Sequence, residues 1–216
     1  MPSGSSGKIF GIGFQKTGTS SLNVALRQLG FKAAGGFRIN HPKGVAIPPP
    51  VTNAKVLDVA LKRTTVGDSF NDNPWPVLFR ELDAAFPDAK FILTTRAPDR
   101  WIASVVRHFA DRPGDMARWI YGVPYPKGNE ARYLDVYTAH NDAVRAHFAD
   151  RPDKLLEIDF ERGGAWPELC AFLHRPIPKA AFPHDNKAEN RGWKQRVRWR
   201  RLKAALFGGR VFGGRR

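Results

Sequence analysis

The sequence contains one cysteine, Cys170, among 216 residues, and this scarcity excludes an internal disulfide framework. A single thiol also suits a reducing compartment. Cys170 lies among apolar residues at helical spacing (Trp166, Leu169 and Leu173), which favours a buried structural thiol over a nucleophile.

Long hydrophobic runs are missing as well. No apolar stretch approaches the roughly 20 residues that a membrane-spanning helix needs. Residues 1–7 (MPSGSSG) lack the basic and apolar pattern of a secretory signal and are interpreted as a flexible leader. We therefore expect a cytoplasmic protein. The six histidines show no metal-ligand spacing, since only His140 and His147 share one expected helix, so we expect no metal site.

Acidic residues are scarce in the last part of the chain. Residues 187–216 hold eleven Lys and Arg and one Glu, so they carry +10 of the net charge of +15. Residues 193–207 (WKQRVRWRRLKAALF) favour a partly amphipathic basic helix that contacts an anionic membrane surface from the cytoplasmic side. A dock for an acidic acceptor or nucleic acid, or a solvated tail, are the alternatives. No nucleic-acid recognition module is present in the sequence, so no specific nucleic-acid partner is expected.

Strands alternate with helices along the rest of the chain, which predicts an α/β protein with a central, mainly parallel sheet flanked by helices. The expected domain spans residues 8–186, between the leader and the tail at 187–216. Strands are expected at 9–14, 31–37, 90–95 and 154–158, with a polar loop and one short extended stretch within 64–73. Helices are expected at 20–29, 54–63, 74–86, 98–109, 130–148 and 165–173.

The first expected strand runs into a loop that nearly matches a nucleotide-binding P-loop. Gly13 and Gly18 have the spacing of G-x-x-x-x-G-K-[ST], but Thr19 fills the lysine position and the cation comes earlier, at Lys16. A strand, loop and helix in this order direct backbone N–H groups and the positive end of the helix at an anion. The loop also offers hydroxyl donors at Thr17, Thr19, Ser20 and Ser21.

The residue that follows a second expected strand differs from the one that P-loop kinases have there. P-loop kinases end this strand in an Asp that holds Mg²⁺, whereas the strand at 90–95 is followed here by Arg96. Arginine cannot ligate a metal, but its planar fork matches a phosphate. Ser104 lies about two helical turns along the next helix, so we expect Arg96 and Ser104 to hold one phosphate. The alternative is that Arg96 pairs with Asp99 and that Ser104 is a solvated helix residue.

The combination of residues 16–21 (KTGTSS), Arg96 and Ser104 resembles the sulfotransferases that use 3′-phosphoadenosine 5′-phosphosulfate (PAPS). The segments GFQKTGTSSLNVALRQLGF, DNPWPVLFRELDAAFPDAKFILTTRAPDRW and AFPHDN resemble a bacterial branch of that family, over most of residues 8–186. The resemblance implies a P-loop-like three-layer fold. It also implies that residues 16–21 hold the 5′-phosphosulfate, that Arg96 and Ser104 hold the 3′-phosphate, and that 3′,5′-adenosine bisphosphate is released.

The implied reaction transfers a sulfuryl group to a hydroxyl or amine of a small-molecule, lipid or glycan acceptor. Lys16 is assigned to the leaving phosphate, where negative charge grows. A base is also implied between the second strand and the next helix, and Asp72 and Asp68 are the candidates, with His41 third. Asp72 is interpreted with equal weight as a helix-capping or turn residue.

Several interpretations stay open. Residues 190–194 only partly match a late segment that binds the 3′-phosphate in many sulfotransferases, which leaves Arg191 and Lys194 as weak candidates. Trp75 and Trp101 are expected to be core residues, with stacking on adenine or acceptor as the alternative. Two other functions compete: a P-loop small-molecule kinase, and a non-catalytic, membrane-associated anion-binding protein of the same fold.

Overall fold

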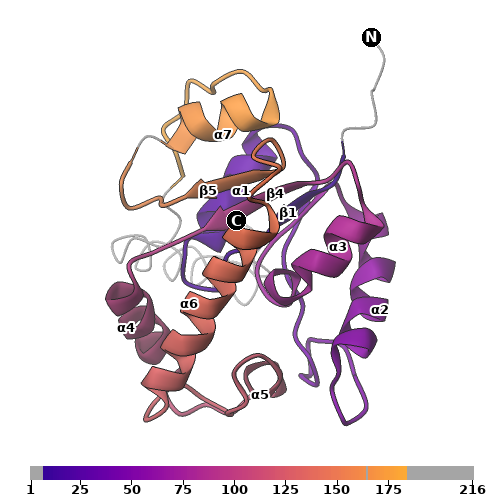
Figure 1. Cartoon of the computed structure of the whole chain (residues 1–216), viewed down its shortest axis with the longest axis vertical. Coiled ribbons are helices and arrows are strands. Elements are labelled where there is room, and N and C mark those ends of the chain that lie inside the picture. Colours follow the sequence, from indigo (N-terminus) through magenta and orange to yellow (C-terminus); the bar gives the residue numbers. More distant parts are fainter. Residues whose placement is uncertain (1–6, 164, 184–216) are drawn as a thin grey trace, which may run out of the picture. The chain divides into compact units, whose positions relative to one another are not determined.

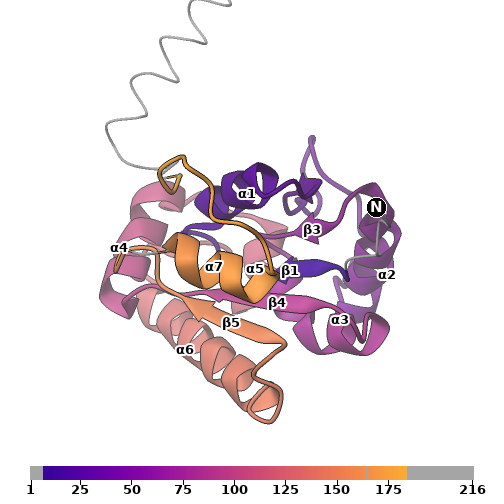
Figure 2. The same ribbon diagram turned by 90° about the horizontal axis from the view of Figure 1, so that it is seen from above.

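The computed structural model describes residues 7–163 and 165–183 of the chain. Their centre is a five-stranded sheet of order β2–β3–β1–β4–β5, in which every pair of neighbours is parallel (Figures 1 and 2). The strands are β1 (Ile9–Gly11), β2 (Ala33–Ala34), β3 (Ser69–Phe70), β4 (Lys90–Thr94) and β5 (Leu155–Ile158).

Seven α-helices and two 3-10 turns accompany these strands within the described residues. The helices are α1 (Thr19–Gln28), α2 (Asn53–Arg63), α3 (Phe79–Ala85), α4 (Pro98–Phe109), α5 (Asp115–Tyr121), α6 (Glu130–His147) and α7 (Ala165–Leu173). The 3-10 turns are η1 (Thr64–Val66) and η2 (Trp75–Leu78).

Helices cover both faces of the sheet, so the described part has three layers. Side chains along a strand alternate between faces, and neighbouring residues of β1 therefore enter different cores. Ile9 packs with residues of α1 and α7, whereas Phe10 packs with residues of α2, α3 and α6. Figure 2 shows α1 and α7 on one side of the strands and α3 and α6 on the other. The predicted α/β class with a parallel sheet is confirmed.

A third core of aromatic residues lies beyond the end of β1. Phe14, Trp101, Tyr121, Tyr133 and Tyr137 join α4, α5 and α6 there. Two pairs of rings are stacked, with centroids 3.7 Å apart for Tyr121 and Tyr133 and 4.1 Å apart for Trp101 and Tyr137. Trp101 and Trp75 are 0% and 1% exposed, which agrees with their interpretation as core residues.

The expected helices and strands agree with the structure apart from their ends and one omission. The expected helix at 74–86 begins as η2 and continues as α3, and the extended stretch expected within 64–73 is β3. Helix α5 was not expected. Cys170 is 2% exposed, and burial raises the pKa of its thiol, as expected of a structural cysteine.

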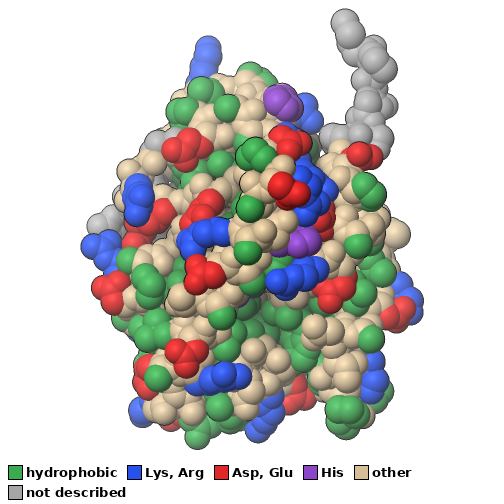
Figure 3. Space-filling model, viewed as in Figure 1, with side chains coloured by type: hydrophobic (Ala, Val, Ile, Leu, Met, Phe, Trp, Pro, Cys, Tyr) green, Lys and Arg blue, Asp and Glu red, His purple; other side chains and the backbone are tan. Residues whose placement is uncertain are grey.

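A buried carboxylate ties α3 to the chain around the end of α6. Asp83 accepts hydrogen bonds from His147 and Arg151, at 2.9 and 2.7 Å, and from Lys154. These donors lower the pKa of Asp83 to about 2, against the effect of its burial. Elsewhere, Figure 3 shows Lys and Arg side chains interspersed with Asp and Glu over the face seen in Figure 1.

Two expected segments fall outside the described residues: most of the leader, and the basic tail at 187–216. The domain limits at 8 and 186 stay a prediction. Among the helices within 7–163 and 165–183, none combines the length and apolar character needed to cross a membrane.

Candidate functional site

Three of the segments that the sequence singles out, those of Lys16, Asp72 and Arg96, lie at the carboxyl edge of the parallel sheet. Ligands bind at this edge in open α/β sheets, because all the strands end there. The loop at residues 12–18 follows β1, Asp72 follows β3, Arg96 follows β4, and Glu161 follows β5. Four segments far apart in the sequence therefore meet at one edge.

The loop after β1 is fixed to β4 by close contacts. A Cβ on Gly13 would lie 2.1 Å from Thr94 Oγ1, so only glycine allows this approach. Thr17 Oγ1 donates to the Phe14 carbonyl at 2.6 Å and lies 2.6 Å from Thr94 Oγ1. Since a hydroxyl has one proton, Thr94 is the donor in the second bond. The Thr17 hydroxyl, expected to cradle phosphate, thus supports the loop itself in this structure.

Two residues with positive φ turn the loop into α1. Lys16 has φ 72° and Gly18 has φ 107°, and α1 begins at the next residue, Thr19. Gly18 is packed against the segment after β5, since a Cβ here would lie 2.5 Å from Phe160 Cδ2. No side chain caps α1. The first turn of this helix therefore presents amides that can bind an anion, and Ser20 and Ser21 belong to the same turn.

The guanidinium of Arg96 reaches back to the loop. Its Nη1 lies 3.4 Å from the Lys16 carbonyl, and its Nη2 donates to Glu161 Oε1 at 2.5 Å. The Nε atom is buried and has no hydrogen-bond partner. The alternative pairing with Asp99 is wrong, because the carboxylate on Arg96 belongs to Glu161. Ser104 lies in the second turn of α4 and is 4% exposed, so it is not a solvated residue.

Asp72 lies on the same edge as Lys16. It is half-buried, has φ 70°, and accepts a hydrogen bond from the Asn73 amide at 2.9 Å. Burial raises the pKa of its carboxyl, although the positive charges of Lys16 and Arg38 oppose this shift. The positive charge of Lys16 is therefore close enough to act on the Asp72 carboxyl. The interpretation as a local turn residue also holds in part, given the bond to Asn73.

Asp68, the other candidate base, lies at the opposite edge of the sheet. It precedes β3, its carbonyl accepts from the Ile9 amide at 2.9 Å, and its carboxylate accepts from the Lys32 amide at 3.0 Å. The structure does not bring Asp68 together with Lys16. His41, the third candidate, is exposed, and its Nε2 lies 3.0 Å from Arg38 Nη1.

Gln15 connects the loop to both the carboxylate segment and the aromatic core. Its Oε1 accepts from Asn73 Nδ2 and its Nε2 donates to the Tyr121 hydroxyl, both at 2.6 Å. Its carbonyl accepts from Trp101 Nε1 at 2.9 Å. Gln15 is not predicted from the sequence, where its only signal is a polar residue directly after an apolar stretch.

Histidines do not contribute a metal site in the part of the chain that the structure describes. His140 Nε2 lies 2.8 Å from the Ile12 carbonyl, and burial lowers the pKa of its imidazole to about 4. His140 is therefore a neutral histidine that carries its proton on Nε2. No group of His, Cys, Asp and Glu within 7–163 and 165–183 is arranged to hold a metal ion. Arg191 and Lys194 lie outside these residues.

Fold and loop together define a class: a three-layer α/β protein with a P-loop-like turn after its first strand. The chain belongs to the sulfotransferase domain family, whose model matches residues 8–126 and 107–191. It is also similar to a protein of Aspergillus versicolor named Ava biosynthesis cluster protein M. The two are 32% identical over 218 aligned residues, which cover 82% of this chain and 80% of that protein. The family resemblance is thereby confirmed, while the bacterial branch stays a prediction.

Proposed function

We propose that this protein transfers a sulfuryl group from PAPS to a hydroxyl or amine of an acceptor. The observation that carries this proposal is the meeting of Lys16, Arg96 and Asp72 at one edge of the sheet. Arg96 contacts the Lys16 carbonyl, and the Lys16 charge reaches the Asp72 carboxyl. Lys16 and Arg96 supply one cation for each phosphate-bearing end of PAPS, and the Asp72 carboxylate beside them can accept the proton of the acceptor. The proposed reaction requires all three groups.

The residues at this edge fit a bisphosphate nucleotide. The buried Nε of Arg96 lacks a hydrogen-bond partner, and a phosphate oxygen is a suitable acceptor for it. Ser104 lies in the helix that follows Arg96, where we assign it to the same 3′-phosphate. Thr19, Ser20 and Ser21 begin α1, and the first turn of a helix is suited to the 5′-phosphate because its amides point toward the N-terminal end.

Lys16 would act on the leaving group. PAPS, when bound, supplies a sulfuryl group attached to a phosphate. As the S–O bond breaks, negative charge grows on the oxygen that stays with the phosphate, and the Lys16 ammonium neutralises it. The amides at the start of α1 hold the same phosphate in place. A single positioned donor of this kind is typically worth ~3 kcal/mol of barrier.

Asp72 would take the proton of the acceptor hydroxyl or amine while the acceptor attacks sulfur. Burial raises the pKa of this carboxyl, which makes it a stronger base than an exposed aspartate. The side chain of the next residue, Asn73, is held by its 2.6 Å hydrogen bond to the Gln15 side chain. We propose a small-molecule, lipid or glycan acceptor.

Calorimetric titration tests this function. The full chain is titrated with 3′,5′-adenosine bisphosphate and, separately, with ATP and Mg²⁺. We expect the bisphosphate to bind more tightly, and tighter binding of ATP would reject the proposal in favour of the kinase. Incubation with PAPS and a panel of acceptors, read by mass spectrometry, then tests catalysis. Bisphosphate binding without any sulfated product would match the non-catalytic alternative.

A further inference from the structure

A single carboxylate bridges two arginines beside the loop. Glu161 accepts from Arg96 Nη2 at 2.5 Å through Oε1, and from Arg100 Nη1 at 3.3 Å through Oε2. Arg96 follows β4, Arg100 lies in the first turn of α4, and Glu161 follows β5. No local sequence signal predicts this pairing, since Arg96 and Glu161 are 65 positions apart.

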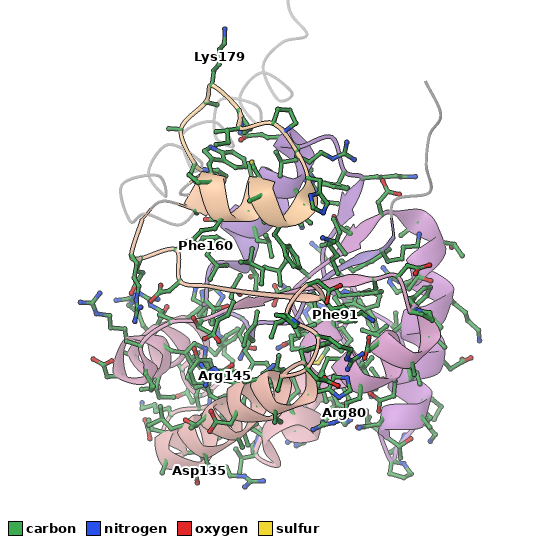
Figure 4. The ribbon with its side chains drawn as sticks, turned by 45° about the horizontal axis from the view of Figure 1, so that its top comes forward. Arg80, Phe91, Asp135, Arg145, Phe160 and Lys179 are labelled. Atoms are coloured by element: carbon green, nitrogen blue, oxygen red, sulfur yellow. The ribbon has the colours of Figure 1, made fainter. Side chains whose placement is uncertain are left out.

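The backbone beside Glu161 is anchored, whereas its side chain reaches the surface. Phe160 is 8% exposed, packs against Gly18 of the loop, and lies 4.9 Å from the Phe182 ring. Figure 4 shows Phe160 on the segment beside α7. The Glu161 amide donates to Asp159 Oδ1 at 2.9 Å. The Glu161 side chain is 36% exposed, so it can rotate into solvent without displacing Phe160.

The Glu161 carboxylate does not bind every N–H group of the Arg96 guanidinium. Nη2 contacts Glu161, Nη1 contacts the Lys16 carbonyl, and the buried Nε has no partner. A carboxylate has two oxygens, and both are already engaged with the two arginines. A phosphate has three oxygens and more negative charge, so it can bind both guanidinium groups and also reach Nε.

We propose that Glu161 occupies, in the free protein, the position of the nucleotide 3′-phosphate. Arg100 is then the second guanidinium of that phosphate site, and Glu161 is an internal competitor that weakens nucleotide binding. A carboxylate and a phosphate repel each other, so both cannot occupy the pair of arginines. This inference rests on the proposed function, because it assumes that Arg96 receives the 3′-phosphate.

The variant Glu161→Gln tests the competition, because glutamine keeps the shape of the side chain and removes its charge. Titration of the full chain with 3′,5′-adenosine bisphosphate should show affinity increased about fivefold, the size expected from releasing one partly exposed ion pair. Adenosine 5′-phosphate, which has no 3′-phosphate, should bind this variant and the natural protein equally. The control is Glu157→Gln, which removes a carboxylate of β5 that pairs with Arg145 of α6 at 2.8 Å.

The same titrations assign Arg100. Combined with Glu161→Gln, the change Arg100→Gln should weaken bisphosphate binding about fivefold relative to Glu161→Gln alone, without affecting adenosine 5′-phosphate. Unchanged or weaker bisphosphate binding by Glu161→Gln would overturn the inference and make Glu161 a support for Arg96. An equal gain for both nucleotides would also overturn it. If the natural protein binds 3′,5′-adenosine bisphosphate no more tightly than adenosine 5′-phosphate, the proposed function itself fails, because no site for the 3′-phosphate is then present.

Discussion

The phenol of Tyr137 is bonded to both backbone groups of Arg96. It accepts from the Arg96 amide at 3.0 Å and donates to the Arg96 carbonyl at 2.8 Å. Tyr137 belongs to α6, and its ring stacks on Trp101 of α4, which in turn donates to the Gln15 carbonyl in the loop. The backbone of Arg96, the arginine that we propose binds phosphate, is therefore fixed by the aromatic core, whereas the guanidinium stays at the edge of the sheet.

Removing this hydroxyl should weaken the binding of the bisphosphate. Tyr137→Phe keeps the stacked ring but leaves the Arg96 amide and carbonyl without their partner. We expect a loss of stability of about 1–2 kcal/mol and a loss of affinity for 3′,5′-adenosine bisphosphate of about three- to tenfold. Thermal unfolding and calorimetry measure the two effects.

The control for that prediction is Tyr133→Phe, one turn earlier in α6. Tyr133 is also stacked and buried, with a phenol pKa raised by burial to about 12, but it lies against Tyr121 instead of Arg96. Its loss should leave nucleotide affinity unchanged. Equal affinities of the two variants would show that the Tyr137 hydroxyl does not position Arg96.

Lys16→Ala should greatly lower turnover while changing nucleotide affinity less. In the proposed reaction the Lys16 ammonium stabilises the charge that develops as the S–O bond breaks, so its loss is expected to lower kcat by about 100- to 1,000-fold. The dissociation constant of the bisphosphate should rise less than tenfold. Lys8→Ala is the matched control, because Lys8 donates to the Gly67 carbonyl at 2.8 Å on the opposite edge of the sheet. A Lys16→Ala variant with near-normal kcat would refute the assignment.

Asp72→Asn and Asp68→Asn separate the two candidate bases. Amide replacement removes the proton acceptor but keeps the size of the side chain. We expect Asp72→Asn to lower kcat by about 100-fold or more and Asp68→Asn to leave it near normal. Rates under acceptor saturation, with folding checked by circular dichroism, give the comparison. Activity that survives in Asp72→Asn and disappears in Asp68→Asn would transfer the role to Asp68.

The sequence predicts best where the signal is local. The spacing of Gly13, Lys16 and Gly18 after an apolar run defines the loop within ten residues, and the structure places it there. Arg96 is likewise a local signal, since it follows the clearest strand. In such cases strand, turn and helix depend on neighbours along the chain.

Contacts between residues far apart in the chain cannot be predicted from this sequence alone. Asp99 is the carboxylate nearest to Arg96 along the chain, but Glu161 is its partner, because β4 and β5 are adjacent in the sheet. The choice between Asp68 and Asp72 likewise depends on β3, whose two residues form a strand only by pairing with β1 and β2. Helix α5, which the sequence does not predict, is also short. It depends on a distant contact, because Tyr121 at its end stacks on Tyr133 of α6.

The basic tail leads to a separate prediction about membranes. Its charge of +10 within residues 187–216 supports the proposal of peripheral contact with anionic lipid. Deleting residues 195–216 should reduce co-sedimentation with anionic vesicles, and the difference from the full chain should shrink at high salt. The same measurement with uncharged vesicles is the control. Equal sedimentation of both proteins with anionic vesicles would exclude this role for the tail.

Buried His140 should make the fold less stable in mild acid. Its pKa is about 4 in the folded protein and 6.5 ordinarily, so between these pH values the unfolded chain binds a proton that the folded protein does not. Stability therefore falls as pH drops from 6.5 to 4, by about 3 kcal/mol in total. Asp83 acts in a different range, because its stabilisation is lost only as pH falls from 3.8 towards 2.

The variant His140→Gln should flatten this pH dependence, since glutamine keeps a donor for the Ile12 carbonyl but does not titrate. Urea unfolding at several pH values between 6.5 and 4 measures the slope, with His41→Gln as the control at an exposed position. The natural protein and His41→Gln should lose stability in parallel. A His140→Gln variant with the same slope as the natural protein would show that another group causes the acid sensitivity.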